Sequence, residues 1–207
     1  MKKPINNVDT AVILAGGENK RFPALKGFIK IDGIPIIEKT LGILKGMFDE
    51  VLISTNMPEA YFHLGVPMVG DMLPSSGPMA GIYSSLLNAK GNSIFVVACD
   101  MPFINADIIR FVCNEHGKIS KRINVDATIP VYGNEPQPLF GVYSKTIISR
   151  LEKGIAEGKT ALKRFLGEIN THFISASDIK AIDFNGRSFV NINTVEDYKA
   201  VIRNASA

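Results

Sequence analysis

The 207-residue chain has few of the side chains that form cross-links or soft-metal sites, with two cysteines and three histidines. Cys99 and Cys113 stand in unlike contexts, with no CxxC pair and no histidine at metal-ligand spacing. The sequence therefore predicts neither a disulfide framework nor a zinc site. His63, His116 and His172 are scattered and match no catalytic triad. This cysteine usage fits a reducing compartment, and we expect a cytoplasmic protein.

Long apolar runs and a strong excess of one charge are also absent. No stretch reaches the ~20 apolar residues that cross a bilayer, and the first apolar run lacks a signal-peptide cleavage pattern. The formal charge of +3 is spread along the chain. We therefore expect neither nucleic acid nor a membrane as partner, and a small anionic substrate suits the mildly basic balance better.

The distribution of apolar residues indicates the fold class. Hydrophobic residues make up 46% of the chain, enough for a substantial core. Short β-branched segments alternate with segments of helical spacing. We expect strands at residues 8–14, 51–54, 66–69, 93–98, 126–130, 137–143 and 188–191, and helices at 34–48, from 77, from 105 or 107 to about 115, after 144 and from 194. The alternation predicts one α/β domain over residues 1–207, a three-layer, Rossmann-like arrangement with a mainly parallel twisted sheet.

In such sheets ligands bind beyond the carboxyl ends of the strands. Four separate segments follow predicted strand ends with flexible or polar residues: Gly16-Gly17, Ser54 to Asn56, Asp71 and Asp100. We expect these segments to form one site.

The loop after the first strand is the clearest functional signal. Paired glycines let backbone N–H groups approach an anion. Arg21 and Lys26 follow, and Pro23 between them prevents a regular helix. Neither a Gly-x-Gly-x-x-Gly pattern nor a Walker A motif is present. The loop therefore predicts phosphate binding that uses neither of these two motifs. The alternative is a tight turn, which also uses paired glycines.

Two acidic residues are candidate ligands. Asp100 follows the most apolar predicted strand, where a carboxylate suits a Mg²⁺ ion that bridges phosphates. The alternative is that Asp100 caps the helix near Pro102. Asp71 follows Gly70, where a turn role is as well supported as a ligand role. The sequence favours magnesium at Asp100 and leaves Asp71 open.

Several segments in order resemble the molybdenum cofactor guanylyltransferase family: Leu14-Ala-Gly-Gly17 with Arg21 and Lys26, Gly77-Pro-Met-Ala-Gly-Ile82, Cys99-Asp-Met-Pro-Phe103, Gln137-Pro-Leu-Phe-Gly-Val-Tyr143 and Phe189-Val-Asn-Ile-Asn-Thr194. The resemblance covers nearly the whole chain and implies a nucleotidyltransferase fold. It also implies a reaction in which the terminal phosphate of molybdopterin attacks the α-phosphorus of GTP, releasing pyrophosphate and forming the guanine dinucleotide of the cofactor.

The resemblance assigns the nucleotide to the part of the chain up to about residue 125. It implies that Lys26 contacts the triphosphate and stabilises the transition state, that Arg21 holds the leaving pyrophosphate, and that Asp100 binds Mg²⁺. The other nucleotide contacts that it implies are Leu14, Ala15, Gly16, Gly17, Ser54, Asn56, Asp71 and Gly81.

The acceptor contacts implied by the resemblance lie in the C-terminal part, at Gln137, Asn191 and Asn193. Amides suit a heterocycle because each offers a donor and an acceptor, and a two-residue spacing puts both asparagines on one face of a strand. Alternatively, the asparagines only shape the turn into a capping box of Thr194 and Asp197, and Gln137 only shapes a proline-flanked loop. The implied partners are GTP and molybdopterin, with transient contacts to cofactor-delivery proteins.

Two other functions would use the same residues. One is cytidylyl transfer to molybdopterin, or nucleotidyl transfer to another small phosphorylated acceptor. The other, of a different class, is nucleotide binding without catalysis, against which the presence of both Lys26 and Asp100 argues.

Overall fold

The computed structural model describes residues 8–16, 25–74 and 77–205. Within these ranges, the strands of the main sheet are β1 (Thr10–Leu14), β4 (Glu50–Ser54), β5 (Met68–Val69), β6 (Ser93–Ala98), β7 (Ala127–Tyr132), β8 (Glu135–Pro136), β9 (Phe140–Ser144) and β10 (Thr171–Ile174). A separate hairpin consists of β2 (Lys30–Ile31) and β3 (Ile34–Pro35). The α-helices are α1 (Ile36–Lys45), α2 (Pro58–Tyr61), α3 (Pro78–Asn88), α4 (Ala106–Ile119), α5 (Ile148–Ala156), α6 (Leu162–Leu166), α7 (Ala176–Lys180) and α8 (Val195–Ala205).

The main sheet is mainly parallel, as the sequence predicts. Its order is β10-β7-β9-β6-β1-β4-β5, with β8 paired to β7. β1 pairs in parallel with β4 and β6, and β5 pairs in parallel with β4. β9 is antiparallel to β6 and β7. The start of β9 therefore lies at the same edge as the carboxyl ends of β1, β4 and β6.

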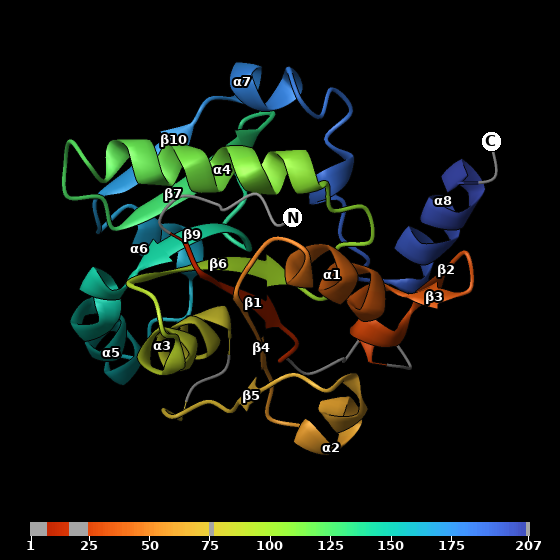
Figure 1. Ribbon diagram of the computed structural model, residues 1–207, viewed down its shortest axis with the longest axis horizontal. Helices are drawn as coiled ribbons and strands as arrows, with labels where there is room; N and C mark the ends of the chain where they lie inside the picture. The colour runs from red at the N-terminus through yellow and green to blue at the C-terminus, as the bar shows by residue number, and fades with distance from the viewer. Residues whose placement is uncertain (1–7, 17–24, 75–76, 206–207) are drawn as a thin grey trace.

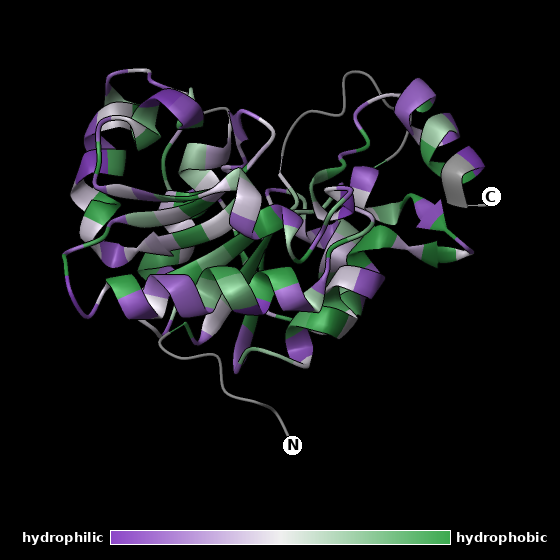
Figure 2. Cartoon of the chain, turned by 90° about the horizontal axis from the view of Figure 1, so that it is seen from above, coloured by the Kyte–Doolittle hydropathy of each residue, from purple (hydrophilic) through white to green (hydrophobic). Residues whose placement is uncertain are grey.

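Helices cover both faces of the sheet, which confirms the α/β class (Figure 1). Along β1, Ala11 and Ile13 face the core beneath α1, α4 and α7, whereas Val12 and Leu14 face the core beneath α3, α5 and α6. Apolar residues fill the central strands, and polar residues lie mostly on the outer faces of the helices (Figure 2). No helix of the described ranges combines the length and the apolar character needed to cross a membrane.

The prediction of a strand at residues 188–191 is wrong. Residues Arg187–Phe189 form a 3-10 turn that follows Gly186, whose φ of +61° is left-handed. The Asp183 carboxylate accepts hydrogen bonds from the backbone N–H groups of Arg187 and Ser188, at 3.0 and 2.7 Å, and so bends the chain here. The sequence pattern also does not predict β10, which pairs in parallel with β7 at the edge of the sheet.

Helix α8 packs beside the β2–β3 hairpin, away from the main sheet (Figure 1). Ile31 and Ile36 form a small apolar cluster there with Ile192 and Val201. The backbone N–H of Ile192 donates a hydrogen bond of 3.0 Å to the carbonyl of Asp100. The segment before α8 is therefore fixed against the end of β6.

Candidate active site

Backbone hydrogen bonds hold the carboxyl ends of the central strands together. The Ala15 N–H donates to the Ser54 carbonyl at 2.8 Å, and the Cys99 N–H donates to the Leu14 carbonyl at 3.1 Å. Pairing thus continues one residue beyond β1 and β6. A Cβ on Gly16 would meet no atom of the described residues within 4 Å. Those residues therefore leave space beside the end of β1, as a ligand next to the backbone requires.

Gly17 and Arg21 lie outside the described residues. Their roles in phosphate binding stay predictions.

Lys26 lies at the centre of the site. Its Nζ donates a hydrogen bond of 3.0 Å to Asp100 Oδ2 and one of 2.6 Å to Asn193 Oδ1. Lys26 begins a 3-10 turn that packs beside Cys99, since a Cβ on Gly27 would lie 3.5 Å from Cys99 Cβ. An ammonium has three N–H donors, so one remains without a partner among the described residues. This donor can bind an anionic ligand.

Asp100 does not cap the following helix. Asn105 is the N-cap of α4, because its side chain accepts a hydrogen bond of 2.8 Å from the Asp107 N–H. Asp100 is 9% exposed, and its Oδ1 is buried without a hydrogen-bond partner among the described residues. A buried carboxylate oxygen without a partner is costly, and a cation or a hydrogen-bond donor would satisfy it.

Asn56 and Asp71 are brought together, although 15 residues separate them. Asn56 Nδ2 donates to Asp71 Oδ2, and the Asp71 N–H donates to Asn56 Oδ1, both at 2.8 Å. This reciprocal pair joins the ends of β4 and β5. It gives both residues a structural partner, and their contact with a nucleotide stays a prediction.

Gly81 is buried at the point where α3 approaches the sheet. A Cβ at this position would lie 2.6 Å from Ser54 Oγ and 3.1 Å from Leu14 Cδ2. Glycine is therefore required here for close packing. Gly81 packs against both Ser54 and Leu14, and this contact places the start of α3 against the ends of β1 and β4.

Cys99 is adjacent to Asp100 but is no candidate nucleophile. Burial, together with the charge of Asp100, raises the pKa of the Cys99 thiol to about 12. The thiol is therefore protonated at neutral pH. This argues against a covalent cysteine intermediate.

The two asparagines predicted to share a strand face point to different places. Asn193 contacts Lys26, whereas Asn191 Nδ2 donates 3.1 Å to the Phe189 carbonyl and its side chain helps to line a pocket. The prediction of one shared face is wrong because no strand forms here. In the structure, Asn193 instead accepts a hydrogen bond from Lys26.

The capping box that the sequence offered as an alternative is present. The Asp197 N–H donates to Thr194 Oγ1, and Asp197 Oδ2 accepts hydrogen bonds of 2.9 Å from the N–H groups of both Asn193 and Thr194. These bonds hold the pKa of the Asp197 carboxyl below its usual value, and the bond from the Asn193 N–H has the largest effect. The start of α8 thus fixes the backbone that carries Asn193.

A pocket of about 260 Å³ adjoins this centre, since one lining residue, Met101, directly follows Asp100. The other residues that line it are Pro136, Gln137, Pro138, Leu139, Phe140, Lys163 and Asn191. Two predicted acceptor residues, Gln137 and Asn191, therefore share one pocket. Lys163 was not a predicted site residue, and no motif around it in the sequence indicates that it lies here.

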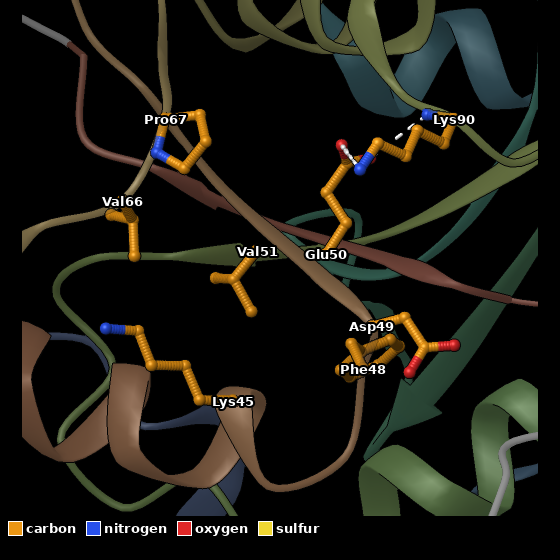
Figure 3. A pocket seen from close by; sticks show the side chains of 8 residues that line it. All are labelled: Lys45, Phe48, Asp49, Glu50, Val51, Val66, Pro67 and Lys90. Carbon is orange, nitrogen blue, oxygen red and sulfur yellow. Dashed lines mark hydrogen bonds and ion pairs between the residues drawn. The ribbon is translucent and has the colours of Figure 1, made fainter.

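Another pocket of about 260 Å³ lies at the opposite, amino edge of the sheet (Figure 3). One of its charged lining residues is Glu50, whose Oε2 accepts hydrogen bonds from Thr10 Oγ1 and the Lys90 N–H. None of the predicted site residues lines it.

Comparisons with known proteins show the family and the fold of the chain. The family profile described as MobA-like NTP transferase domain matches residues 11–172. The chain is 34% identical to the "Probable molybdenum cofactor guanylyltransferase" of Peptoclostridium acidaminophilum, over 92% of this chain and 86% of that protein. It is 31% identical to the "Molybdenum cofactor guanylyltransferase" of Syntrophotalea carbinolica, over 92% and 89%. The crystal structure of molybdopterin-guanine dinucleotide biosynthesis protein A from Archaeoglobus fulgidus superposes with a TM-score of 0.82 at 25% identity, covering 95% of this chain and 98% of that one.

Proposed function

The chain belongs to the MobA-like NTP transferase family and is an enzyme of the nucleotidyltransferase type, and we propose that it transfers GMP from GTP to molybdopterin. The products are pyrophosphate and molybdopterin guanine dinucleotide. The names of its relatives support this choice of substrates. The observation that carries the proposal is the Lys26 ammonium, held between Asp100 and Asn193, with a third donor that has no partner among the described residues and can bind a phosphate.

Lys26 has the main electrostatic role in this proposal. Both substrates are polyanions, so their approach is opposed by charge repulsion, and negative charge builds on the leaving pyrophosphate. A fixed ammonium beside the α-phosphate lowers both costs. Asp100 and Asn193 hold the ammonium in place before the substrates bind, which reduces the ordering required in the transition state.

The residues at Asp100 fit a magnesium ion. Magnesium is usually held by one or two carboxylates together with substrate phosphates and water. Asp100 offers one buried oxygen without a hydrogen-bond partner in the described part of the chain, which contains no cluster of three or more His, Cys, Asp or Glu side chains able to hold a metal ion. The remaining ligands would come from the triphosphate and water. When bound, the ion would screen the phosphate charges that Lys26 alone does not neutralise.

The nucleotide and the acceptor would approach from two sides of this centre. The ends of β1, β4 and β5 present Gly16 and the Asn56–Asp71 pair on one side. The pocket with Gln137 and Asn191 lies on the other. This arrangement supports a direct transfer between the two substrates, without a covalent intermediate on the protein.

The proposal is tested by incubating the pure protein with MgCl₂, molybdopterin and either GTP or CTP. We expect pyrophosphate and the dinucleotide product with GTP, and a loss of both in Lys26→Ala. Turnover with CTP and none with GTP would contradict guanylyl transfer and indicate cytidylyl transfer. Nucleotide binding without product, or unchanged turnover in Lys26→Ala, would contradict the assigned mechanism.

A further inference from the structure

A lysine on the pocket beside Asp100 has no role in the reaction described so far. Lys163 lies on α6, whose Leu162, Phe165 and Leu166 side chains are buried in the core. This anchoring leaves Lys163 on the outer side of the helix, where it lines the pocket with Gln137 and Asn191. A cation is therefore fixed near the amides predicted to bind the acceptor.

Lys163 is held by a partner that an anion can replace. Its Nζ forms an ion pair with Glu135 Oε2, and the two side chains are 58% and 67% exposed. Exposed ion pairs of this kind contribute little to stability. The ammonium can therefore exchange Glu135 for an anionic ligand at small cost.

The pocket is small for a whole acceptor. At about 260 Å³ it is smaller than the ~300–1,000 Å³ of a site that encloses a whole ligand. It would take part of an acceptor, and the rest would extend past Met101, which lines the pocket, toward the adjacent Asp100. The reacting phosphate has its cation in Lys26, so Lys163 is available for a different group.

We infer that Lys163 selects the acceptor by binding a second anionic group, remote from the phosphate that reacts. The inference rests on the proposed function and deepens it: in molybdopterin the second group is the ene-dithiolate. Glu135 is the competing anion, which occupies Lys163 when the acceptor is absent. Lys163 is thus a specificity-determining residue, and it takes no part in bond making.

The test measures equilibrium binding of molybdopterin through its pterin fluorescence, and steady-state turnover with GTP. Lys163→Met keeps the length of the side chain and removes its charge. We expect it to weaken molybdopterin binding about tenfold, as for the loss of one partly exposed charge-assisted hydrogen bond, with the KM for GTP unchanged. Glu135→Gln frees Lys163 and should tighten binding about two- to threefold.

Lys159 provides the matched control. It lies shortly before Lys163, its side chain is 41% exposed, and it pairs with Glu157 and Glu168 away from the pocket. Lys159→Met should leave molybdopterin binding unchanged. Equal affinities of Lys163→Met and Lys159→Met would overturn the inference.

A pterin monophosphate without the dithiolene distinguishes the two anionic groups. Lys163→Met should bind this compound as the unaltered protein does, and an equal loss for both compounds would overturn the assignment to a second group. Binding of molybdopterin that weakens in Lys163→Met, with no product from GTP, would support the inference and contradict the proposed function. Absence of molybdopterin binding to the unaltered protein would overturn both.

Discussion

Asn193→Ala separates two roles for one residue. The family resemblance implies that Asn193 contacts the pterin, whereas the structure shows its Oδ1 accepting a hydrogen bond from Lys26 Nζ. Alanine removes the amide and leaves Asp100 as the remaining partner of the ammonium. If Asn193 positions the lysine, the substitution impairs use of the nucleotide rather than binding of the acceptor.

The size of the effect follows from the geometry of this bond. It is 2.6 Å long, and hydrogen bonds to charged groups contribute about 1.5–3 kcal/mol. Because 21% of the Lys26 side chain is exposed, the lower end applies, about 1.5 kcal/mol. We expect kcat/KM for GTP to fall about tenfold, since ~1.4 kcal/mol corresponds to a factor of ten. Lys26→Ala should cost far more, because the ammonium itself is lost.

The assay is pyrophosphate release with GTP varied at saturating molybdopterin, then with molybdopterin varied at saturating GTP. Asn191→Ala is the matched control, because Asn191 lines the acceptor pocket without contacting Lys26. It should raise the KM for molybdopterin and leave kcat/KM for GTP unchanged. If Asn193→Ala behaves in the same way as Asn191→Ala, the positioning role is refuted. Thermal unfolding of both variants verifies that the fold is retained.

Three further predictions concern the fold and the metal. Gly81→Ala places a Cβ 2.6 Å from Ser54 Oγ and should lower the free energy of unfolding by about 1–3 kcal/mol; an unchanged urea midpoint would show that α3 can move aside. Burial lowers the folded-state pKa of His116 to about 4. Between about pH 6.5 and 4 the unfolded chain therefore binds a proton that the folded protein does not. The free energy of unfolding should decrease by up to about 3 kcal/mol as the pH is lowered through this range. His116→Gln should lose this part of the pH dependence in urea unfolding, and an identical pH profile would contradict the assignment. Asp100→Asn removes the negative charge of the carboxylate whose Oδ1 lacks a partner among the described residues. It should raise the Mg²⁺ concentration for half-maximal turnover about tenfold or more. An unchanged Mg²⁺ concentration for half-maximal turnover would show that the ion binds elsewhere.

The regular part of the fold could be predicted from the sequence because its signals are local. The apolar strands that end at Leu14 and Ala98 need no tertiary information, and their predicted ends agree with the structure. Likewise, Thr194 and Asp197 form the predicted capping box because they are only three residues apart. The parallel pairing of the strands explains why the predicted site residues lie at one edge of the sheet.

The C-terminal part could not be predicted in the same way. The β-rich composition of residues 188–191 suggests a strand, but the Asp183 carboxylate binds the backbone N–H groups that a strand would pair. β10 is short, and its place beside β7 depends on tertiary pairing. The contact of Asn193 with Lys26 spans 167 residues, a distance over which sequence spacing carries no information.

That same separation has a consequence for biosynthesis. The hydrogen bond between Lys26 and Asn193 closes a loop of most of the chain, because its two partners are 167 residues apart. During translation the amide partner emerges 167 residues after the lysine. Contacts this distant in sequence form late and slow the folding of a chain. A ribosome that stops before Asn193 therefore releases a product in which the lysine lacks this partner, so the active centre is incomplete until Asn193 has been added.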